Sequence, residues 1–302
     1  MTAPDALHPR GPASDAAFAD LVRPFERELR AHCYRMLGSL HDAEDALQET
    51  LISAWRALPQ FEGRSSLRTW LYRIATSRCL NAIRDGARRP PPSPVAPFEA
   101  PAPNGDERVT WCDPYPEAAV DPGTAAAERE TLEYAFVCAL QALPPRQTAA
   151  LVLCDVLDFS PRECAEIIGS SPTAVKGLLQ RARAAMPARG ERAPEVAETE
   201  LAGRLAAAYG ADDVDAVIAL LSDRAWLAMP PAPHRYEGVA AVAEFLRASA
   251  EGRGGRYAVS AAGRAGGHPV FRCVLDGRDR GLLMVIADPS GTAVQGIVRF
   301  LR

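Results

Sequence analysis

Apolar residues recur every three or four positions along the first 90 residues, which is the spacing of one face of an α-helix. The pattern predicts three amphipathic helices there, over 18–37, from about residue 42 to 55, and over 67–83. Gly38 suits the end of the first helix, and Ser65 or Ser66 can cap the start of the third. The N-terminal part of the chain is therefore expected to be a small helical domain.

Helical spacing returns after residue 130, with stronger start and stop signals. Apolar faces over 132–140 and 149–156 predict two helices, and Pro144-Pro145 opens the second. Two short helices then follow: Ser160-Pro161 starts one, Gly169 is placed to end it, and Ser171-Pro172 starts the next. Two helices joined by a tight turn that contains glycine are typical of a helix-turn-helix.

The last hundred residues mix the two periodicities. Helical spacing near 201–209, 214–221 and 239–246 is combined with five short strand-like runs, at 224–229, 256–262, 269–275, 282–287 and 293–301. Helices followed by a strand, a helix and several antiparallel strands form an α+β pattern.

Proline-rich breaks divide the chain into domains. Ten prolines lie between Pro90 and Pro122, too many for a helix or a central strand, and a weaker break lies at 187–194. The predicted organisation is listed in chain order: a disordered N-terminus at 1–14, a helical domain at 15–89, an acidic Pro-rich linker at 90–127, a helix-turn-helix domain at 128–187 and an α+β domain at 197–302.

Composition alone narrows the class of protein. The 302 residues carry a net charge of −4, and no run is long and apolar enough for a membrane span or a secretory signal, so a cytoplasmic protein is expected. The seven cysteines are scattered and never form a C-x-x-C pair, which argues against disulfides and a zinc site. The acidic net charge, taken alone, argues against a nucleic-acid partner.

The distribution of charge reverses that inference. Residues 62–89 hold seven arginines against two acids, a local charge of +5, and residues 172–189 hold four basic residues and no acid. The segment 90–130 has a local charge of −6. Two basic patches are therefore separated by an acidic connector, and phosphate binding depends on such local concentrations.

Three helix faces carry candidate chemistry. On the second helix, Asp42, Asp45, Gln48 and Glu49 share one side; this stripe is either a solvated face or an interface. The third helix has an arginine and amide face after an aromatic, serine-containing loop, which suits single-stranded DNA but also suits plain solvation. On the second helix of the helix-turn-helix, Thr173, Lys176, Gln180 and Arg183 present donors for base edges and phosphates, and we expect no acid to oppose them. A helical hairpin without a DNA function is the alternative there.

Three motifs in this order resemble regions 2 and 4 of extracytoplasmic-function sigma factors, the smallest sigma-70-type initiation subunits of bacterial RNA polymerase. The motifs are DAEDALQET at 42–50, SLRTWLYRIA at 66–75 and TAVKGLLQRAR at 173–183. The resemblance covers about residues 15–187 and implies two helical domains joined by a linker.

The resemblance also implies partners and residue roles. The acidic residues Asp42, Asp45, Gln48 and Glu49 are expected to bind the clamp helices of the polymerase largest subunit, and the flap is a further expected contact. Melting and capture of the −10 element as a single strand are expected of Phe61, Arg64, Ser65, Ser66, Arg73, Ser77, Asn81 and Arg84. Recognition of the −35 duplex is expected of Thr173, Lys176, Gln180, Arg181 and Arg183.

Two departures from the family pattern keep the promoter sequence open. Ser77 stands where Asn is common, and Gly177 stands where Ser is common in the recognition helix. In this family the linker threads through the polymerase toward the active-site and RNA-exit region. The segment Trp111–Pro116, within the linker, fits either that path or a disordered tether with one aromatic docking spot.

The α+β domain resembles the SnoaL-like branch of the conical NTF2-like fold. Such cones usually hold a pocket, and the pocket candidates here are Trp226, His234, Arg272 and Asp276. The sequence shows no acid/base pair at a defined spacing, so we expect no catalytic residue, metal or cofactor, and instead a regulatory domain that packs against the sigma regions and senses a small ligand. A separate anti-sigma factor remains open. The alternatives are a polyketide-cyclase-like enzyme or ligand-binding protein with a DNA-binding N-terminal half, and a helix-turn-helix repressor that acts without polymerase.

Overall fold

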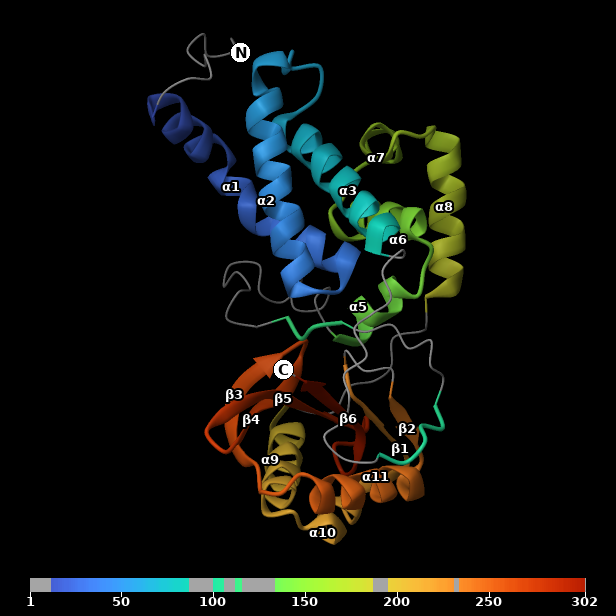
Figure 1. The fold of residues 1–302 in the computed structure, drawn as a ribbon. Coiled ribbons are helices and arrows are strands. Elements are labelled where there is room, and N and C mark those ends of the chain that lie inside the picture. The colour runs from blue at the N-terminus through green and yellow to red at the C-terminus, as the bar shows by residue number, and fades with distance from the viewer. Residues whose placement is uncertain are drawn as a thin grey trace. The chain divides into compact units, whose positions relative to one another are not determined.

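The chain forms two compact units in the computed structural model, which describes residues 12–86, 100–105, 112–115, 134–186, 195–230 and 234–301 (Figure 1). The first unit comprises residues 1–90 and 136–187, and the second comprises 91–135 and 188–302. The two helical domains predicted as separate therefore share one unit, and the linker segments belong with the α+β domain. Trp111 and Pro116 lie outside the described residues.

The N-terminal helices of the first unit follow the hydrophobic pattern closely. They are α1 (Pro12–Leu37), α2 (Leu40–Ala57), the short 3-10 helix η1 (Leu58–Gln60) and α3 (Leu67–Gly86). The side chain of Ser39 caps α2 by accepting a hydrogen bond from the backbone N–H of Asp42. α1 begins at Pro12, so three residues assigned to a disordered N-terminus are helical.

The remaining helices of the first unit include the predicted helix-turn-helix. They are α5 (Tyr134–Gln141), α6 (Pro145–Leu151), the π-helical turn η3 (Val152–Val156), α7 (Pro161–Ile168) and α8 (Pro172–Ala185). Ser160 and Glu163 form a reciprocal capping box at the start of α7, and Ser171 caps α8. Gly169 ends α7 with φ of 61°, a left-handed conformation that costs glycine little.

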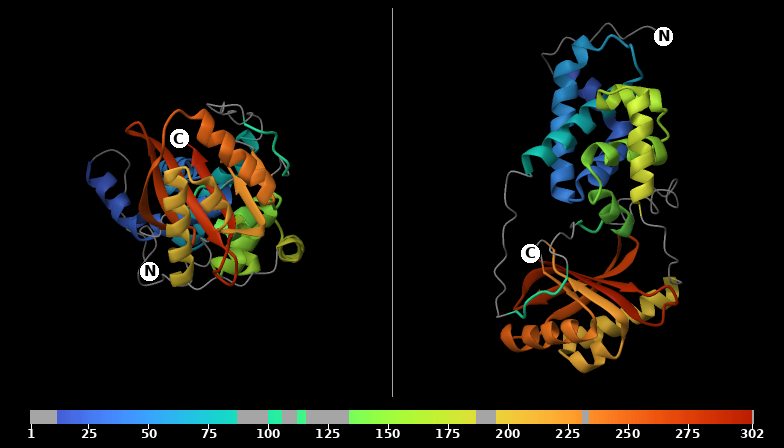
Figure 2. Two further views of the ribbon diagram at one scale, coloured as in Figure 1. Left: turned by 90° about the horizontal axis from the view of Figure 1, so that it is seen from below. Right: turned by 90° about the vertical axis from the view of Figure 1, so that its right-hand side faces the viewer.

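The second unit is a sheet with helices on one face, as Figures 1 and 2 show. Its helices are α9 (Glu195–Ala211), α10 (Val214–Ile218) and α11 (Val239–Gly252). Its strands are β1 (Leu221–Ala228), β2 (Arg235–Glu237), β3 (Ala258–Ala265), β4 (His268–Leu275), β5 (Arg278–Ala287) and β6 (Val294–Leu301). The strand order is β2-β1-β6-β5-β4-β3.

One pairing in this sheet differs from the antiparallel arrangement that the sequence suggested. β1 and β6 run parallel, with Trp226 opposite Gly296, whereas the other pairs are antiparallel. A parallel pair needs a long crossover, and α11 with the β3–β5 meander supplies it. The core lies between the sheet and α9–α11, around Leu205, Val242 and Leu283.

The described residues hold seven free cysteines, five of them buried. Within the same residues, no helix combines the length and apolar character that crossing a membrane demands.

Candidate nucleic-acid and partner interfaces

The acidic face of α2 is exposed to solvent. Asp42, Asp45, Gln48 and Glu49 are all exposed, while Ala43 and Leu47 on the opposite side are buried against the unit. Asp45 Oδ2 lies 3.7 Å from Nε2 of His41, one turn earlier. The four polar residues therefore share a surface that is held on a rigid helix.

Ile52 adds an apolar group to this face. It follows Gln48 and Glu49 at helical spacing, and 42% of its surface is exposed, so it is one of two large hydrophobic side chains left exposed in the described residues. A single exposed apolar side chain is common on protein surfaces, so Ile52 extends this face without by itself marking an interface. Ile52 was not among the residues expected from the sequence, although its position on the polar side of the helix was a usable signal.

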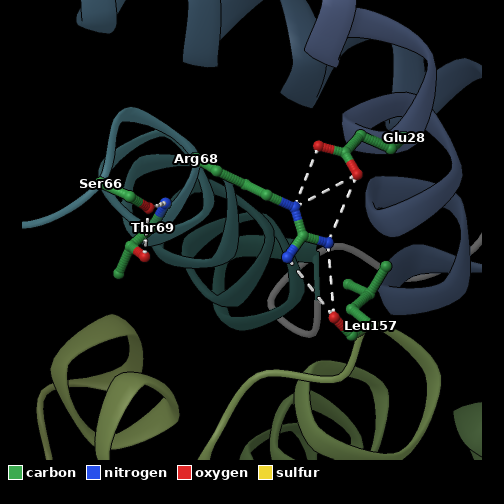
Figure 3. Close-up of polar contacts among 5 residues, drawn as sticks. All are labelled: Glu28, Ser66, Arg68, Thr69 and Leu157. Atoms are coloured by element: carbon green, nitrogen blue, oxygen red, sulfur yellow. Dashed lines mark hydrogen bonds and ion pairs between the residues drawn. The ribbon is translucent and has the colours of Figure 1, made fainter.

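The loop before α3 is anchored by contacts of its own residues. Phe61 is half-buried, with its ring 4.9 Å from that of Trp70. Ser66 caps α3: its Oγ accepts from the backbone N–H of Thr69 at 3.0 Å and also lies 2.8 Å from Thr69 Oγ1 (Figure 3). Arg64 is exposed beside Glu62. Any base captured here would meet a preorganised loop.

Along α3 the expected strand-binding residues lie on the accessible side. Arg73, Ser77 and Arg84 are exposed, and Asn81 is partly so, whereas Trp70, Ala75 and Cys79 are buried. Ser65 is likewise partly exposed. The structure thus places these polar side chains on a single face of α3, and the charged ones among them are arginines. At the far end of this face, Arg84 lies beside Asp85.

Arg68 belongs to the same basic segment but points into the unit. Its guanidinium contacts the carboxylate of Glu28 on α1 at 3.3–3.4 Å and the backbone oxygen of Leu157 at 3.4–3.5 Å (Figure 3). It also lies 4.3 Å from the ring of Phe159 and 5.1 Å from that of Tyr72. The local charge of +5 therefore overstates the charge that faces outward, because Arg68 joins α1 and α3 to the helix-turn-helix.

The recognition helix α8 exposes every residue assigned to it. Thr173, Lys176, Gln180, Arg181 and Arg183 are all on the surface, and Val175, Leu179 and Ala182 are buried on the other side. This is the division that a helix in a major groove requires.

An acid does oppose one of these donors, which corrects the picture drawn from α8 alone. Asp155, in the π-helical turn, accepts from Arg183 Nε at 2.8 Å and from Nη2 at 2.6 Å. The two residues are 28 positions apart, so helical spacing within α8 could not reveal the pair. The bidentate contact leaves Nη1 of Arg183 directed away from this carboxylate.

The turn of the helix-turn-helix is braced from α6. Arg146 Nη2 donates to the backbone oxygen of Ile168 at 3.1 Å and lies 3.5 Å from that of Gly169. These are carbonyl groups that the end of α7 leaves without helical partners. Arg146 therefore supports the turn that leads into α8, and it was not among the residues expected from the sequence.

In the second unit, two described pieces of the linker, residues 100–105 and 112–115, form a linker strap on the α+β domain. The Tyr236 hydroxyl donates to Pro101 O at 2.9 Å. Asn104 makes two hydrogen bonds with the backbone of Glu237, at 2.7 and 3.0 Å, and Gly105 N donates to Arg235 O at 3.0 Å. The strap thus lies against the edge strand β2, held by one backbone hydrogen bond and three side-chain hydrogen bonds.

A second anchor holds the strap at the β3–β4 turn. Gly266 N donates to Tyr115 O at 2.9 Å, and Tyr134 N donates to Gly266 O at 3.0 Å. Tyr115 and Cys112 are almost fully buried, and the ring of Tyr134 lies 5.9 Å from that of Phe300. Part of the segment predicted to be a linker is therefore folded against its own C-terminal domain.

The four residues expected to line a pocket in this domain do not converge. Trp226 lies in β1, beneath the guanidinium of Arg235 at 4.5 Å, and His234 precedes β2. Arg272 lies in β4 and pairs with Asp279, and Asp276 is in the following turn. Two strands, β6 and β5, separate β1 from β4, which keeps the two pairs of residues apart.

A cavity instead opens between α9, α10 and α11. It has an empty volume of about 220 Å³, counting the part open to solvent. Five apolar side chains and three polar residues line it: Ala208, Val214, Val217, Leu246 and Ala250, with Tyr209, Asp212 and Arg253. None of the four expected pocket residues is among them.

A buried polar cluster joins α9 to the β3–β4 hairpin. Glu198 is 1% exposed, and its carboxylate contacts Arg264 Nη2 and His268 Nδ1, both at 2.7 Å. Arg264 also donates to the backbone oxygen of Gly267. A carboxylate and a histidine thus meet where the sequence showed no pair, but Arg264 neutralises the carboxylate and ties the cluster to the hairpin, which is what a structural ion network does.

Comparison with known families agrees with both helical domains. The family model of Sigma-70 region 2 matches residues 21–89, and that of Sigma-70, region 4 matches residues 134–186. The ECF RNA polymerase sigma factor SigW of Bacillus subtilis (strain 168) is 31% identical over 170 residues, which cover 56% of this chain and 87% of SigW. The chain belongs to the extracytoplasmic-function sigma factor family.

Another relative of this sigma factor is similar beyond the sigma regions. The ECF RNA polymerase sigma factor SigG of Mycobacterium tuberculosis (strain ATCC 25618 / H37Rv) is 44% identical over 243 residues. The matched residues are 76% of this chain and 65% of SigG, so the chain spans just under two thirds of that relative.

The crystal structure of the Mycobacterium tuberculosis extracytoplasmic function sigma factor SigJ shares the fold of nearly the whole chain. The TM-score is 0.59 at 22% identity, and the match covers 93% of this sigma factor and 96% of SigJ. The fold class is therefore helical sigma domains followed by an α+β NTF2-like domain, as the sequence predicted.

Proposed function

We propose that this protein binds core RNA polymerase in the cytoplasm and directs promoter-specific initiation, with no catalysis of its own. The observation that carries the proposal is the joint exposure, on one helical unit, of the acidic face of α2 and the recognition face of α8. Both faces fall inside the two sigma-70 matches. A repressor acting on duplex DNA alone would have no use for the α2 face.

The residue roles within this proposal follow the three exposed faces. Asp42, Asp45, Gln48 and Glu49, with Ile52, contact the polymerase clamp. The loop and α3 capture the −10 strand through arginines on phosphates and the Phe61 ring near a flipped base. Thr173, Lys176, Gln180, Arg181 and Arg183 contact the −35 duplex.

Run-off transcription with purified core polymerase tests the main proposal. Full-length protein should support initiation from a promoter-bearing template and none from a template whose −10 and −35 elements are scrambled.

Asp45→Ala with Glu49→Ala should lower affinity for core polymerase at least fivefold and leave −35 duplex binding intact. Asp215→Ala with Glu251→Ala removes the same charge from the other unit and should change neither. Absence of promoter-dependent initiation would refute the sigma-factor proposal.

We also propose that the C-terminal domain restrains the linker. Asn104, Gly105 and Tyr115 are hydrogen-bonded to that domain, and the family resemblance implies that the same linker enters the polymerase. The two states compete for one segment, so docking on β2 opposes engagement with polymerase. This gives the domain a regulatory role without a separate anti-sigma factor.

Breaking the strap tests this second proposal. Asn104→Ala with Tyr236→Phe removes three hydrogen bonds of the strap, and Gly105→Ala sets a methyl group 2.7 Å from Arg235 Cγ. Either variant should raise run-off transcription several-fold at limiting protein. Asn104→Asp with intact Tyr236 is a milder variant, because the side chain still accepts from Glu237 N and loses only the bond to Glu237 O. Faster proteolysis within the linker combined with unchanged transcription would show that the strap is no brake.

A further inference from the structure

Asp155 contacts the recognition helix α8 although it belongs to another element. It lies in the π-helical turn η3, and its carboxylate accepts from Nε and Nη2 of Arg183 at 2.8 and 2.6 Å. A bidentate pair of this kind fixes the plane of the guanidinium as well as its position. Turns of π-helix are rare and frequently occur at functional sites. The pair therefore merits an explanation in terms of what α8 does.

The stability of the fold gives only a weak reason for this pair. The side chains of Arg183 and Asp155 are 60% and 30% exposed, and ion pairs at such exposure contribute little to stability. The helix-turn-helix has other supports, including the capping box of Ser160 and Glu163. An acid that contacts a DNA-binding arginine also lowers the positive charge offered to phosphates. The position of Asp155 thus calls for a role in binding.

The contact with Asp155 occupies one edge of the Arg183 guanidinium and leaves another. Nε and Nη2 donate to the carboxylate. The donors that face away from it are those of Nη1 and the second N–H of Nη2, which form the end of the planar group. This end can donate two parallel hydrogen bonds to the oxygens of a phosphate or to a guanine edge.

The place of Arg183 along α8 decides between these two targets. Thr173 lies in the first turn of α8 and Arg183 in the last turn, ten residues later. At about 1.5 Å per residue they are roughly 15 Å apart along the axis, more than the roughly 12 Å width of the major groove. Recognition helices contact base edges with their N-terminal residues, so the last turn reaches the sugar-phosphate wall. The end of the Arg183 guanidinium is therefore placed for a phosphate.

The pair with Asp155 also changes how Arg183 responds to DNA of any sequence. A free arginine carries a full positive charge and follows any nearby phosphate, which strengthens binding to all sequences alike. Arg183 together with Asp155 carries no net charge, and its direction is fixed. It contributes where a phosphate stands at the position that correct docking requires, and it contributes little when the duplex is out of register.

We propose that Asp155 is a positioning residue that makes DNA binding selective: it restricts Arg183 to one phosphate of the correctly docked −35 duplex and removes that arginine from non-specific binding. The inference rests on the function proposed above for α8. It adds a specificity-determining residue that lies outside the recognition helix.

Asp155→Ala in the full-length protein tests the proposal, with fluorescence anisotropy at several salt concentrations as the measurement. The ligands are a duplex that carries the −35 element of a transcribed promoter and a scrambled duplex of equal length. The variant should bind the scrambled duplex about threefold more tightly, with a salt dependence steeper by about one counterion, because Arg183 is released. Binding to the −35 duplex should not strengthen. The ratio of the two affinities should therefore fall about threefold.

Two further variants separate this role from a general effect of charge. Glu166, an exposed acid on α7 of the same helix-turn-helix, is the matched control. Glu166→Ala removes the same charge from outside the pair, so it should shift both affinities together and leave their ratio unchanged. Asp155→Ala combined with Arg183→Ala should have the same ratio as Arg183→Ala alone, because Asp155 acts through that arginine.

The outcomes that would overturn the inference are distinct from those that concern the sigma-factor proposal. A −35 preference that Asp155→Ala leaves intact, or that Glu166→Ala lowers equally, would refute the selective role of Asp155 alone. A destabilised Asp155→Ala protein that binds both duplexes equally more weakly, with an unchanged salt dependence, would show a merely structural pair. If the natural protein has no preference for the −35 duplex, the function proposed for α8 fails and this inference fails with it.

Discussion

The recognition helix α8 and the buried cluster around Glu198 use the same kinds of charged side chain in opposite ways. On α8, Lys176 and Arg183 are exposed and lie seven residues apart on one helix. In the cluster, Glu198 meets Arg264 and His268 across 66 and 70 residues, and the carboxylate is shielded from water. An exposed charge contributes mainly to binding, whereas a buried one contributes to the stability of the fold.

The largest expected effect tests the buried side of this contrast. Glu198→Ala removes the short ion pair of Arg264, whose side chain is only 16% exposed. Because a buried charge then loses its partner, we expect a loss of about 3 kcal/mol of unfolding free energy. Glu195→Ala is the matched control, because Glu195 contacts the same arginine at 3.7 Å but is 74% exposed; it should cost under about 0.5 kcal/mol. Urea unfolding followed by circular dichroism measures both. Equal losses of unfolding free energy in the two variants would contradict the distinction between buried and exposed charges.

A buried histidine in the first unit makes the stability of the fold depend on pH. Burial, with the nearby Arg35 and Arg68, lowers the pKa of His32 from 6.5 to about 3. The unfolded chain therefore takes up a proton that the folded chain refuses, and the stability present above pH 6.5 is lost as pH falls toward 3. At pH 5 the loss from this group is about 2 kcal/mol.

Comparing two histidine variants isolates that contribution. His32→Gln should flatten the fall in stability between pH 6.5 and 4, measured by urea unfolding across pH, even if it lowers stability at pH 7. His41→Gln removes an exposed histidine, 84% accessible, and should leave the pH profile unchanged. A profile that responds equally to both changes would contradict the role of burial.

For the exposed charges of α8 we expect smaller effects, which concern DNA binding and leave folding unchanged. Lys176→Ala should weaken binding to a −35 duplex by about fivefold, near 1 kcal/mol, and lower the salt dependence by about one counterion. Its unfolding midpoint should stay within experimental error. Arg204→Ala, an exposed arginine on α9, serves as control, and fluorescence anisotropy at several salt concentrations is the measurement. A large loss of stability with unchanged DNA binding would show that Lys176 supports the fold and does not contact DNA.

The smallest expected change concerns Gly177 in α8. A Cβ added there would have its nearest neighbour, Arg181 Nη1, at 3.5 Å, an ordinary contact. Gly177→Ser should therefore raise the unfolding free energy by about 0.5 kcal/mol, because serine favours a helix more than glycine does. Thermal unfolding checks this, and a destabilised variant would indicate that the backbone of α8 is closely approached at this position.

Local signals along the chain predicted most of the helical unit. Ser160, Gly169 and Ser171 marked the helix-turn-helix, and the structure has a capping box, a left-handed end and a second cap at those residues. The faces of α2, α3 and α8 were also correct, because helical periodicity acts within a few residues. The local pattern did not reveal partners far along the chain: Asp155 for Arg183, and Glu28 and Leu157 for Arg68.

By itself, the sequence determined the helix faces, the caps, the order of the sigma motifs and the α+β class of the C-terminal domain. Only the tertiary structure decided the parallel pairing of β1 with β6, the docking of the strap on β2, the separation of Trp226 from Arg272, and the contact of Asp155 with Arg183. The physical reason is range. Propensity and periodicity are set by neighbouring residues, whereas strand order and buried charge depend on segments brought together from 20 to more than 100 residues apart.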